Sequence, residues 1–315
     1  MTDSRSIDHI PVLCSDAVGL LTQHPGGTVV DGTVGLGGHA EAILDADPTL
    51  QLVGIDRDAE ALDRARMRLA RFGSRARLVY GNYRDLERLL DQIDVDAIDG
   101  LLLDLGVSSL QLDDARRGFS FRGDGSLDMR MDRTGGSSAA EWLATASQME
   151  IAETLRTYGE ERYAERIARA IDQARCREPV ATTGMLAEIV RRAVPAGYRH
   201  GRLDPATRTF QAIRIRVNGE LDALEEGLCA GFDRLTCGGV LAAISFHSLE
   251  DRIVKRFFQH KAADCVCPPE LPECLCDKKV EAEILTKRPL TAAADEIEAN
   301  PRARSAKLRA VRKVV

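Results

Sequence analysis

The sequence lacks any long apolar segment, which bears first on where the protein works. No apolar run in the 315 residues approaches the roughly 20 residues that a membrane-spanning helix needs. Residues 1–18 contain neither a long apolar stretch nor a convincing cleavage site, so we do not expect a secretory signal. These two absences predict a cytoplasmic enzyme of bacterial type, with no membrane partner.

The sequence also lacks an excess of positive charge. Its formal net charge is −6, which argues mildly against a nucleic-acid partner. A local basic surface is nevertheless enough to follow a phosphate backbone. The basic residues do gather in two stretches, Arg199, His200, Arg202, Arg208, Arg214 and Arg216, and Arg302, Arg304, Lys307, Arg309, Arg312 and Lys313. Two solvated faces explain these stretches slightly better than a binding surface does.

The eight cysteines have no spacing typical of a disulfide framework. Those far apart in the sequence, which we expect to be reduced and buried, are Cys14, Cys176, Cys229 and Cys237. Those within twelve positions are Cys265, Cys267, Cys274 and Cys276. Four such thiols could bind zinc, but their C-x-C pairs are tighter than the usual C-x₂₋₄-C. A redox-sensitive or packed loop is the simpler interpretation, and we assign no metal ligand.

The first third of the chain alternates short apolar runs with helical spacings. Strands are predicted at residues 28–31, 51–56, 76–80 and 100–105, and helices at 37–44, 59–72 and 83–93. Apolar strands separated by helices of this length are typical of βαβ units and of a parallel sheet covered on both faces.

This alternation stops near residue 113, where the chain becomes polar and rich in glycine. Five helices are then predicted at 139–146, 150–158, 161–175, 183–194 and 205–217, with no strand among them. Strand patterns return at 239–246, 283–286 and 306–314. We therefore predict an α/β domain formed by residues 1–112 and 219–315, interrupted by an inserted all-helical domain at 113–218.

A glycine-rich loop, DGTVGLGGH at residues 31–39, lies between a predicted strand and a predicted helix. Glycines there let the backbone turn and approach a ligand, and the following helix offers free amide donors. Asp56 ends the next predicted strand, where a carboxylate can accept both hydroxyls of a ribose. The loop and this acid together predict an adenosine-containing ligand.

The order of the glycines helps to choose that ligand. Gly32, Gly35, Gly37 and Gly38 depart from the G-x-G-x-x-G of dinucleotide sites, and Asp31 precedes them. An acid here suits a cationic ligand and would repel pyrophosphate, which favours S-adenosylmethionine over NAD. Asp31 could equally be a turn-forming residue. An NAD-dependent dehydrogenase and a non-enzymatic RNA-binding protein are the rival interpretations. Cofactor binding by the purified protein separates the RNA-binding protein from the enzymes, and the identity of that cofactor separates the two enzymes.

Three further side chains are candidates for the cofactor site. Asp104 ends the fourth predicted strand, at the edge where sheets of this type bind ligands. A carboxylate there needs a partner because burying an unpaired charge is costly. Asp104 and Gln111 could each bind the cofactor or an incoming base, whereas Tyr83 could cover an adenine or simply belong to the core.

Several strings of the sequence, taken in order, resemble the ribosomal RNA small-subunit methyltransferase H family, also called MraW. They are HIPVL, DGTVGLGGHA, GIDRD, DLGVSS-x-QLD, RGFSF, LDMRMD, YGEER, PATRTFQAIRIRVNGEL, SFHSLEDRIVK and NPRARSAKLR. The resemblance implies a class I Rossmann-like methyltransferase fold with a helical insertion. It also implies methylation by S-adenosylmethionine of the exocyclic N4 of a cytidine in the decoding region of bacterial 16S ribosomal RNA, within the small ribosomal subunit. A homodimer is compatible with it.

The resemblance carries roles over position by position. It places Gly37, Gly38 and His39 in the family's cofactor loop, Asp56 as the ribose acid, and Asp104 and Gln111 in the DLGVSS-x-QLD segment. Tyr83 stands where many relatives have phenylalanine. A cytosine amine is a poor nucleophile that must be held in line with the methyl group, and Asp104 is the candidate catalytic residue. The chain has DLGV where other amine methyltransferases have D/N-P-P-Y/F, so their scheme for orienting the amine does not transfer.

Six residues are candidates for binding the RNA: Trp142, Arg214, Arg216, Asn218, Ser245 and His247. The single tryptophan could stack on an extruded base, although core packing is the simpler interpretation. Arginine can bind a phosphate with two hydrogen bonds. Ser245 and His247 follow a predicted strand, while Ser248 or Asp251 could merely cap the next helix.

Overall fold

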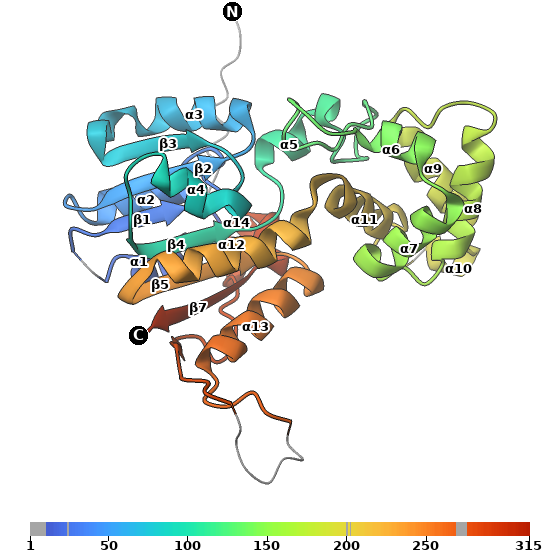
Figure 1. Cartoon of the computed structure of the whole chain (residues 1–315). Coiled ribbons are helices and arrows are strands. Elements are labelled where there is room, and N and C mark those ends of the chain that lie inside the picture. Colours follow the sequence, from blue (N-terminus) through green and yellow to red (C-terminus); the bar gives the residue numbers. More distant parts are fainter. Residues whose placement is uncertain (1–10, 24, 200, 202, 269–275) are drawn as a thin grey trace, which may run out of the picture. The chain divides into compact units, whose positions relative to one another are not determined.

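The computed structural model describes residues 11–23, 25–199, 201, 203–268 and 276–315 (Figure 1). Within these ranges, no helix is both long and apolar enough to cross a membrane. The chain divides into two compact units. Met1–Gly106 and Leu221–Val315 form the first, called the sheet unit here, and Val107–Glu220 form the second, the helical unit. The sequence pattern placed these boundaries at residues 113 and 218.

The sheet unit is built on seven strands in the order β3-β2-β1-β4-β5-β7-β6. Their bounds are β1 Thr28–Asp31, β2 Gln51–Asp56, β3 Ala76–Tyr80, β4 Ile98–Asp104, β5 Leu235–Ser245, β6 Ala282–Ile284 and β7 Lys307–Lys313. The first five strands of that order are parallel, whereas β7 runs antiparallel to both β5 and β6. The order reverses between β1 and β4, which is where sheets of this type bind ligands.

Both faces of the sheet are buried, as the predicted α/β fold requires. Successive residues of β4 alternate between two cores: Leu102 packs in one, and Leu101 and Leu103 pack in the other. Buried side chains of α1 (Cys14–Leu21), α2 (Gly38–Ala46) and α3 (Ala59–Leu69) belong to the first core. Those of α4 (Leu86–Asp91), α12 (Glu220–Arg234) and α13 (Ser248–Ala262) belong to the second. The sequence of a strand that is covered on both sides is a continuous apolar run, and this pattern predicted β4.

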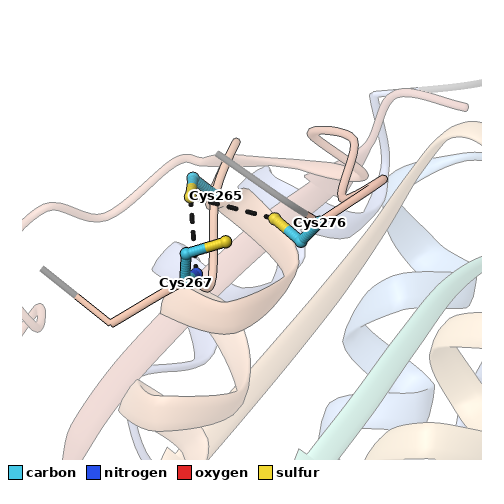
Figure 2. Close-up of side chains that lie close together, drawn as sticks. All are labelled: Cys265, Cys267 and Cys276. Atoms are coloured by element: carbon cyan, nitrogen blue, oxygen red, sulfur yellow. Dashed lines mark hydrogen bonds between the residues drawn. The ribbon is translucent and has the colours of Figure 1, made fainter. Parts of the chain in front are cut away.

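Short elements complete the sheet unit: the 3₁₀ turns η1 (Ala70–Arg75), η2 (Tyr83–Asp85) and η4 (Pro301–Ser305), and helix α14 (Ala294–Ala299). The predicted helix at 59–72 therefore ends as an α-helix at Leu69, and the one at 83–93 begins as a 3₁₀ turn. The segment between α13 and β6 brings three cysteine side chains close together (Figure 2). The expectation that the isolated cysteines are buried is wrong for Cys176, Cys229 and Cys237, which are exposed.

The helical unit contains α5 (Ser109–Asp113), η3 (Ala115–Arg117), α6 (Ala139–Thr145), α7 (Gln148–Gly159), α8 (Ala164–Arg175), α9 (Thr183–Ala193), α10 (Ala196–Arg199) and α11 (Ala206–Asn218). All five predicted helices are confirmed, each with small shifts at its ends. Capping boxes fix two of the starts. Ser138 and Glu141 satisfy each other's backbone amides at α6, and Ser147 and Glu150 do so at α7.

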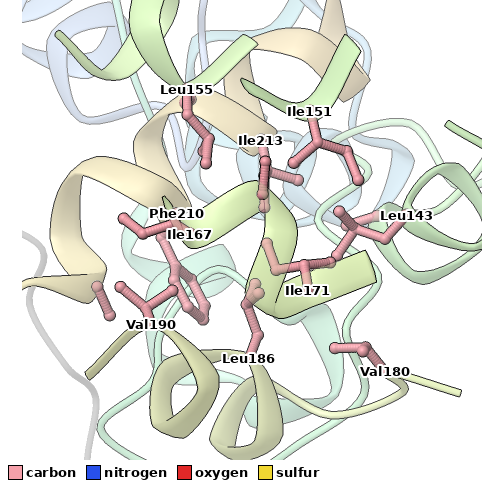
Figure 3. Close-up of a cluster of buried hydrophobic side chains, with 14 of the residues drawn as sticks. Leu143, Ile151, Leu155, Ile167, Ile171, Val180, Leu186, Val190, Phe210 and Ile213 are labelled. Atoms are coloured by element: carbon pink, nitrogen blue, oxygen red, sulfur yellow. The ribbon is translucent and has the colours of Figure 1, made fainter. Parts of the chain in front are cut away.

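The helical unit has a core of its own (Figure 3). Its buried side chains recur at helical spacing: Ile151 and Leu155 on α7, and Ile167 and Ile171 on α8. Helices α7 and α11 approach closely at Gly159, where an added Cβ would lie 2.7 Å from the backbone oxygen of Arg208. This packing explains why a glycine ends α7.

The substitution Gly159→Ala should lower the free energy of unfolding of the helical unit by about 1–3 kcal/mol, because its methyl group meets backbone that cannot move aside. The measurement is urea denaturation followed by circular dichroism. Gly197→Ala is the matched control, since nothing lies within 4 Å of its Cβ position. Equal effects of the two substitutions would contradict the assignment of a close contact at Gly159.

Candidate active site

Three carboxyl groups stand at the carboxyl ends of neighbouring strands. Asp31 ends β1, Asp56 ends β2 and Asp104 ends β4. Because β2, β1 and β4 are adjacent and parallel, these ends meet at one edge of the sheet. Asp31 is only 1% exposed, and the side chain of Asp104 is 21% exposed. The structure thus brings together the three acids that the sequence singled out.

The glycine-rich loop connects these strand ends through hydrogen bonds. The backbone amide of Thr33 donates to Asp31 Oδ1 at 3.1 Å, and the Thr33 hydroxyl accepts from the amide of Asp104 at 2.7 Å. The amide of Gly35 donates to Asp56 Oδ2 at 2.8 Å. Thr33 was not among the residues predicted for the site, since a hydroxyl between glycines carries no distinctive pattern.

Two glycines of the loop are required by conformation or by space. Gly37 adopts φ of 79°, in the left-handed region, and caps α2, whose first residue is Gly38. An added Cβ at Gly32 would lie 2.7 Å from Leu103 Cδ2. The loop therefore passes directly over β4, and α2 begins immediately after it.

Asp56 is held by backbone amides on both of its oxygens. Its Oδ1 accepts from the amide of Asp58 at 2.8 Å, while its Oδ2 accepts from Gly35. Burial raises the pKa of Asp56 to about 6, although these two hydrogen bonds oppose the rise. Each carboxylate oxygen has a second lone pair, so the group is oriented by the protein and can still accept from two ligand hydroxyls.

Asp104 and His39 form a pair that is short of protons. Nε2 of His39 lies 2.9 Å from the carbonyl oxygen of Val12, so this nitrogen must carry a hydrogen. In a neutral imidazole Nδ1 is then an acceptor, and it lies 3.6 Å from Asp104 Oδ2. Burial raises the pKa of Asp104 to about 7 and lowers the pKa of His39. Two acceptors facing each other favour one shared proton, and the two groups titrate as a pair.

The same cluster has an excess of acid. Burial raises the pKa of Asp31 to about 7, with His39 opposing the rise. The carboxylate of Glu250 adds to the raised pKa of Asp104. Oδ1 of Asp104 is buried and accepts no hydrogen bond from any residue that the structure describes. Carboxylates in this condition favour a ligand that carries positive charge and hydrogen-bond donors.

Tyr83 lies in the core beside the loop. It is 9% exposed and packs with the second core of the sheet unit. An added Cβ at Gly227 would lie 2.4 Å from its ring, so the ring rests directly on the backbone of α12. Gln111 belongs to the helical unit, where it forms a capping box with Ser108 at the start of α5. Its side-chain oxygen accepts from the Ser108 amide at 3.1 Å.

Ser245 and His247 have structural contacts after β5. The hydroxyl of Ser245 lies 3.4 Å from the carbonyl oxygen of Lys307, to which it donates. His247, rather than Ser248, caps α13, because its side chain and Glu250 form a capping box. Glu250 was not among the predicted site residues, although a polar residue followed three positions later by glutamate is the usual signal of such a box.

The other proposed cap, Asp251, has a different role. It binds Lys307 at 3.0 Å and Arg309 at 2.7 Å. Part of the C-terminal basic stretch therefore holds α13 against β7. In the first basic stretch, His200 and Arg202 lie outside the described residues, as does Cys274 in the cysteine cluster.

Four RNA-binding candidates lie in the helical unit, and they differ in how far contacts within the unit occupy their side chains. Arg214 binds Glu220 through two hydrogen bonds of 2.9 and 2.7 Å, and both side chains are largely buried. The side-chain nitrogen of Asn218 donates to the carbonyls of Met129 and Arg214, and its side-chain oxygen accepts from the backbone amide of Met131. Both residues therefore have structural roles in this unit.

Arg216 is exposed and lies over the half-buried Trp142, with 5.8 Å between the guanidinium carbon and the ring centroid. Of the four candidates in this unit, these two side chains present polar and aromatic surface that packing does not fully use.

Comparison with known proteins was decisive for the family. The model of the MraW methylase family matches residues 6–314. The chain belongs to this family. It is 54% identical over 307 residues to "Ribosomal RNA small subunit methyltransferase H" of Syntrophotalea carbinolica, covering 97% of this chain and 98% of that protein. The protein of the same name from Trichlorobacter lovleyi is 52% identical with the same coverage.

A solved rRNA methylase from Streptococcus thermophilus is 11% identical, covers 96% of this chain and 94% of that one, and has a TM-score of 0.41. This likeness is too remote to bear on fold or site.

As an MraW methylase, the protein uses S-adenosylmethionine as methyl donor, and the residues of the site suit this molecule. This molecule carries a sulfonium, an ammonium and a ribose diol, and no phosphate. The site offers buried carboxylates in excess, one of them with an orphaned oxygen, beside the glycine-rich loop. Asp56 matches the diol, and Asp31 and Asp104 match the positive charge.

Replacing Asp104 should make the protein more stable at neutral pH. A carboxyl whose pKa rises from 3.8 to about 7 on folding stabilises the native state fully only below pH 3.8. That contribution is lost as the pH rises to about 7, because the unfolded chain releases the proton first. Asp104→Asn should therefore raise the free energy of unfolding by roughly 2 kcal/mol more at pH 8 than at pH 5. Urea denaturation at the two pH values measures this.

Asp251→Asn is the matched control. Its partners Arg309 and Lys307 lower the pKa of Asp251 despite burial, so its carboxylate is ionised in both states at pH 5 and at pH 8. This variant should lose stability by the same amount at each pH. A pH-independent effect of Asp104→Asn would show that its carboxyl is ionised at no cost in the folded protein.

Proposed function

We propose that this protein transfers a methyl group from S-adenosylmethionine to the exocyclic N4 of a cytidine in the decoding region of bacterial 16S ribosomal RNA. The single structural observation that carries the proposal is the cluster of buried carboxyl groups around the glycine-rich loop. The printed name of the relatives, a small-subunit ribosomal RNA methyltransferase, supports the class of substrate. The nucleotide and the atom come from the motif resemblance.

Binding of the donor is assigned to the sheet unit. Asp56 accepts from the ribose, in the orientation fixed by its two amide donors. Gly37 and Gly38 form the closely packed turn that leads from the loop into α2. The acidic pair of Asp31 and Asp104 favours the cationic donor over its neutral thioether product, which helps product release. Gln111 and Tyr83 act indirectly in this scheme, since each is fixed by contacts within its own unit.

The reaction needs a group that accepts one proton, and this group does not have to be a strong base. The donor supplies an electrophilic methyl group. The lone pair of a cytosine amine is delocalised into the ring, so the amine must pyramidalise while it is held in place. The partly exposed carboxylate of Asp104 is the group that accepts a hydrogen bond from the amine and then its proton. A pKa of about 7 suits this role, because a group that is mostly ionised just above neutrality can still hold a proton afterwards.

His39 is the positioning residue for Asp104. With Nε2 committed to the carbonyl of Val12, its Nδ1 faces Asp104 Oδ2 and can share the transferred proton. The ring is 5% exposed, so it is held in one orientation.

The RNA contacts are assigned chiefly to Arg216 and Trp142. An extruded base can stack on an aromatic ring, and an exposed guanidinium can bind a phosphate. Ser245 and His247 are assigned to the substrate side of the sheet edge, after β5. Arg214 and Asn218 support the Arg216 and Trp142 surface from within the helical unit. A substrate within the small ribosomal subunit agrees with a cytoplasmic location.

The decisive experiment is transfer of labelled methyl groups to small ribosomal subunits from cells that lack this protein, followed by nucleoside analysis. Label should appear in N4-methylcytidine. Asp104→Asn should lower kcat by roughly 100-fold or more, since it removes the proton acceptor. Asp56→Ala should mainly raise KM for the donor, about 10-fold or more, because it removes charged hydrogen bonds.

Asp63→Ala is the control, because Asp63 is an exposed carboxylate of the same unit. It should leave both constants unchanged. Label in a nucleoside other than N4-methylcytidine would overturn the proposed target while keeping the methyltransferase. Full activity of Asp104→Asn would remove this residue from the mechanism.

The arginines of α11 should separate into two classes. Arg216→Ala should weaken RNA binding and reduce the dependence of log K on log salt by about 1, as expected for one lost phosphate contact, without affecting folding. Arg214→Ala should instead destabilise the helical unit by about 3 kcal/mol, because it leaves Glu220 buried and unpaired. Filter binding at several salt concentrations and urea denaturation measure the two effects.

Arg216→Lys is the matched control, since it retains the charge and should retain the salt dependence. An unchanged salt dependence in Arg216→Ala would exclude a phosphate contact at this residue.

A further inference from the structure

The segment between α13 and β6 is a loop that is closed at its base. The amide of Glu281 donates to the carbonyl of Lys261 at 2.9 Å, and the Lys261 ammonium lies 2.7 Å from Glu281 Oε2. Lys278 also binds the Glu281 carboxylate. These contacts join the end of α13 to the residue before β6. Side chains from the outgoing and returning parts of the loop can therefore meet.

Three cysteines do meet there (Figure 2). Cys265 and Cys267 lie on the outgoing part and Cys276 on the returning part. Their sulfur atoms all lie within 4.8 Å of one another, and Sγ of Cys265 is 3.8 Å from Sγ of Cys276. The separation between Cys265 and Cys276 is too long for a disulfide bond, which would bring the two sulfur atoms to about 2.05 Å.

The separation of 3.8 Å matches a tetrahedral metal site. Thiolate sulfur binds zinc at about 2.3 Å, and a tetrahedron of that radius has edges of about 3.8 Å. Cys265 and Cys276 are thus already spaced as two ligands of one ion. The limit of 4.8 Å for the whole set leaves Cys267 within a small side-chain adjustment of the third corner.

A backbone contact gives independent support. The amide of Cys267 donates to Sγ of Cys265 at 3.4 Å. An amide directed at sulfur stabilises the negative charge of a thiolate, and metal ligands are commonly held by such donors. A merely packed thiol does not require this contact.

The C-x-C spacing of the cysteines is compatible with such a site. Each C-x-C pair is tighter than the usual zinc pair, but in the structure the ligands come from both sides of the loop. Cys267 and Cys276 are brought together across the intervening residues, so the C-x-C pair need not supply two opposite corners. Soft thiolates in tetrahedral spacing select zinc over magnesium or calcium, which prefer oxygen.

We propose that Cys265, Cys267 and Cys276 bind one Zn²⁺ that fastens the loop between α13 and β6. Binding releases the thiol protons to solvent and leaves at least one further coordination position. The ion has no part in methyl transfer, and this site is independent of the proposed function. It stabilises the part of the sheet unit that follows α13.

The test measures zinc directly in the full-length protein, purified without a chelator and under reducing conditions. Elemental analysis should find about one zinc per chain. Removal of zinc and titration with Co²⁺ should give the intense near-ultraviolet band of cobalt–thiolate bonds and the visible bands of a tetrahedral ion. Cys265→Ser and Cys276→Ser should each abolish or strongly weaken both signals. Cys176→Ser is the matched control, because this exposed cysteine lies in the helical unit.

The wild-type measurements do not depend on how well the variants fold. Absence of zinc together with absence of a cobalt–thiolate spectrum would overturn the proposal. So would a Cys265–Cys276 disulfide in the protein as isolated, detected by mass spectrometry of peptides, since it would make the cluster a redox pair. Equal loss of zinc in Cys176→Ser would place the ion elsewhere.

Discussion

Three carboxyl groups are held largely out of water at one edge of a parallel sheet, with backbone amides and one imidazole around them. Burying carboxyl groups there is costly unless each has a partner, and many of the local contacts offset that cost. The glycine-rich loop brings the amide of Thr33 to Asp31 and that of Gly35 to Asp56, and the single orientation of His39 lets a proton be shared with Asp104. The carboxyl cluster still lacks a positively charged partner, and a sulfonium donor supplies one.

The sequence predicted the framework of this edge well. Strands β1, β2 and β3 lie at the predicted residues, because each is a short and mostly apolar segment between turn-forming or helical stretches. Strand β5 begins four residues before the prediction, at Leu235, since Gly238 and Gly239 interrupt its apolar pattern. Helix α12 was not predicted. Gly227 and Gly231 weaken its helical propensity, yet they are needed where α12 packs against Tyr83 and Leu101.

The roles of individual polar residues were harder to foresee than the elements that carry them. Arg214 and Arg216 look equivalent in the sequence, but the first faces Glu220 and the second faces solvent over Trp142. The helical period separates their directions, while the partner of each depends on distant segments. The cysteine loop shows the same limit, because spacing along the chain does not reveal which thiols meet across a turn.

The helical unit occupies the connection between β4 and α12, inside what is otherwise an ordinary crossover from one parallel strand to the next. Its core is formed by its own residues. An insertion of this kind can lengthen, shorten or diverge during evolution without shifting the register of any strand pair. Selection for a new substrate surface can therefore act on one unit while the strand ends that surround the donor remain as they are.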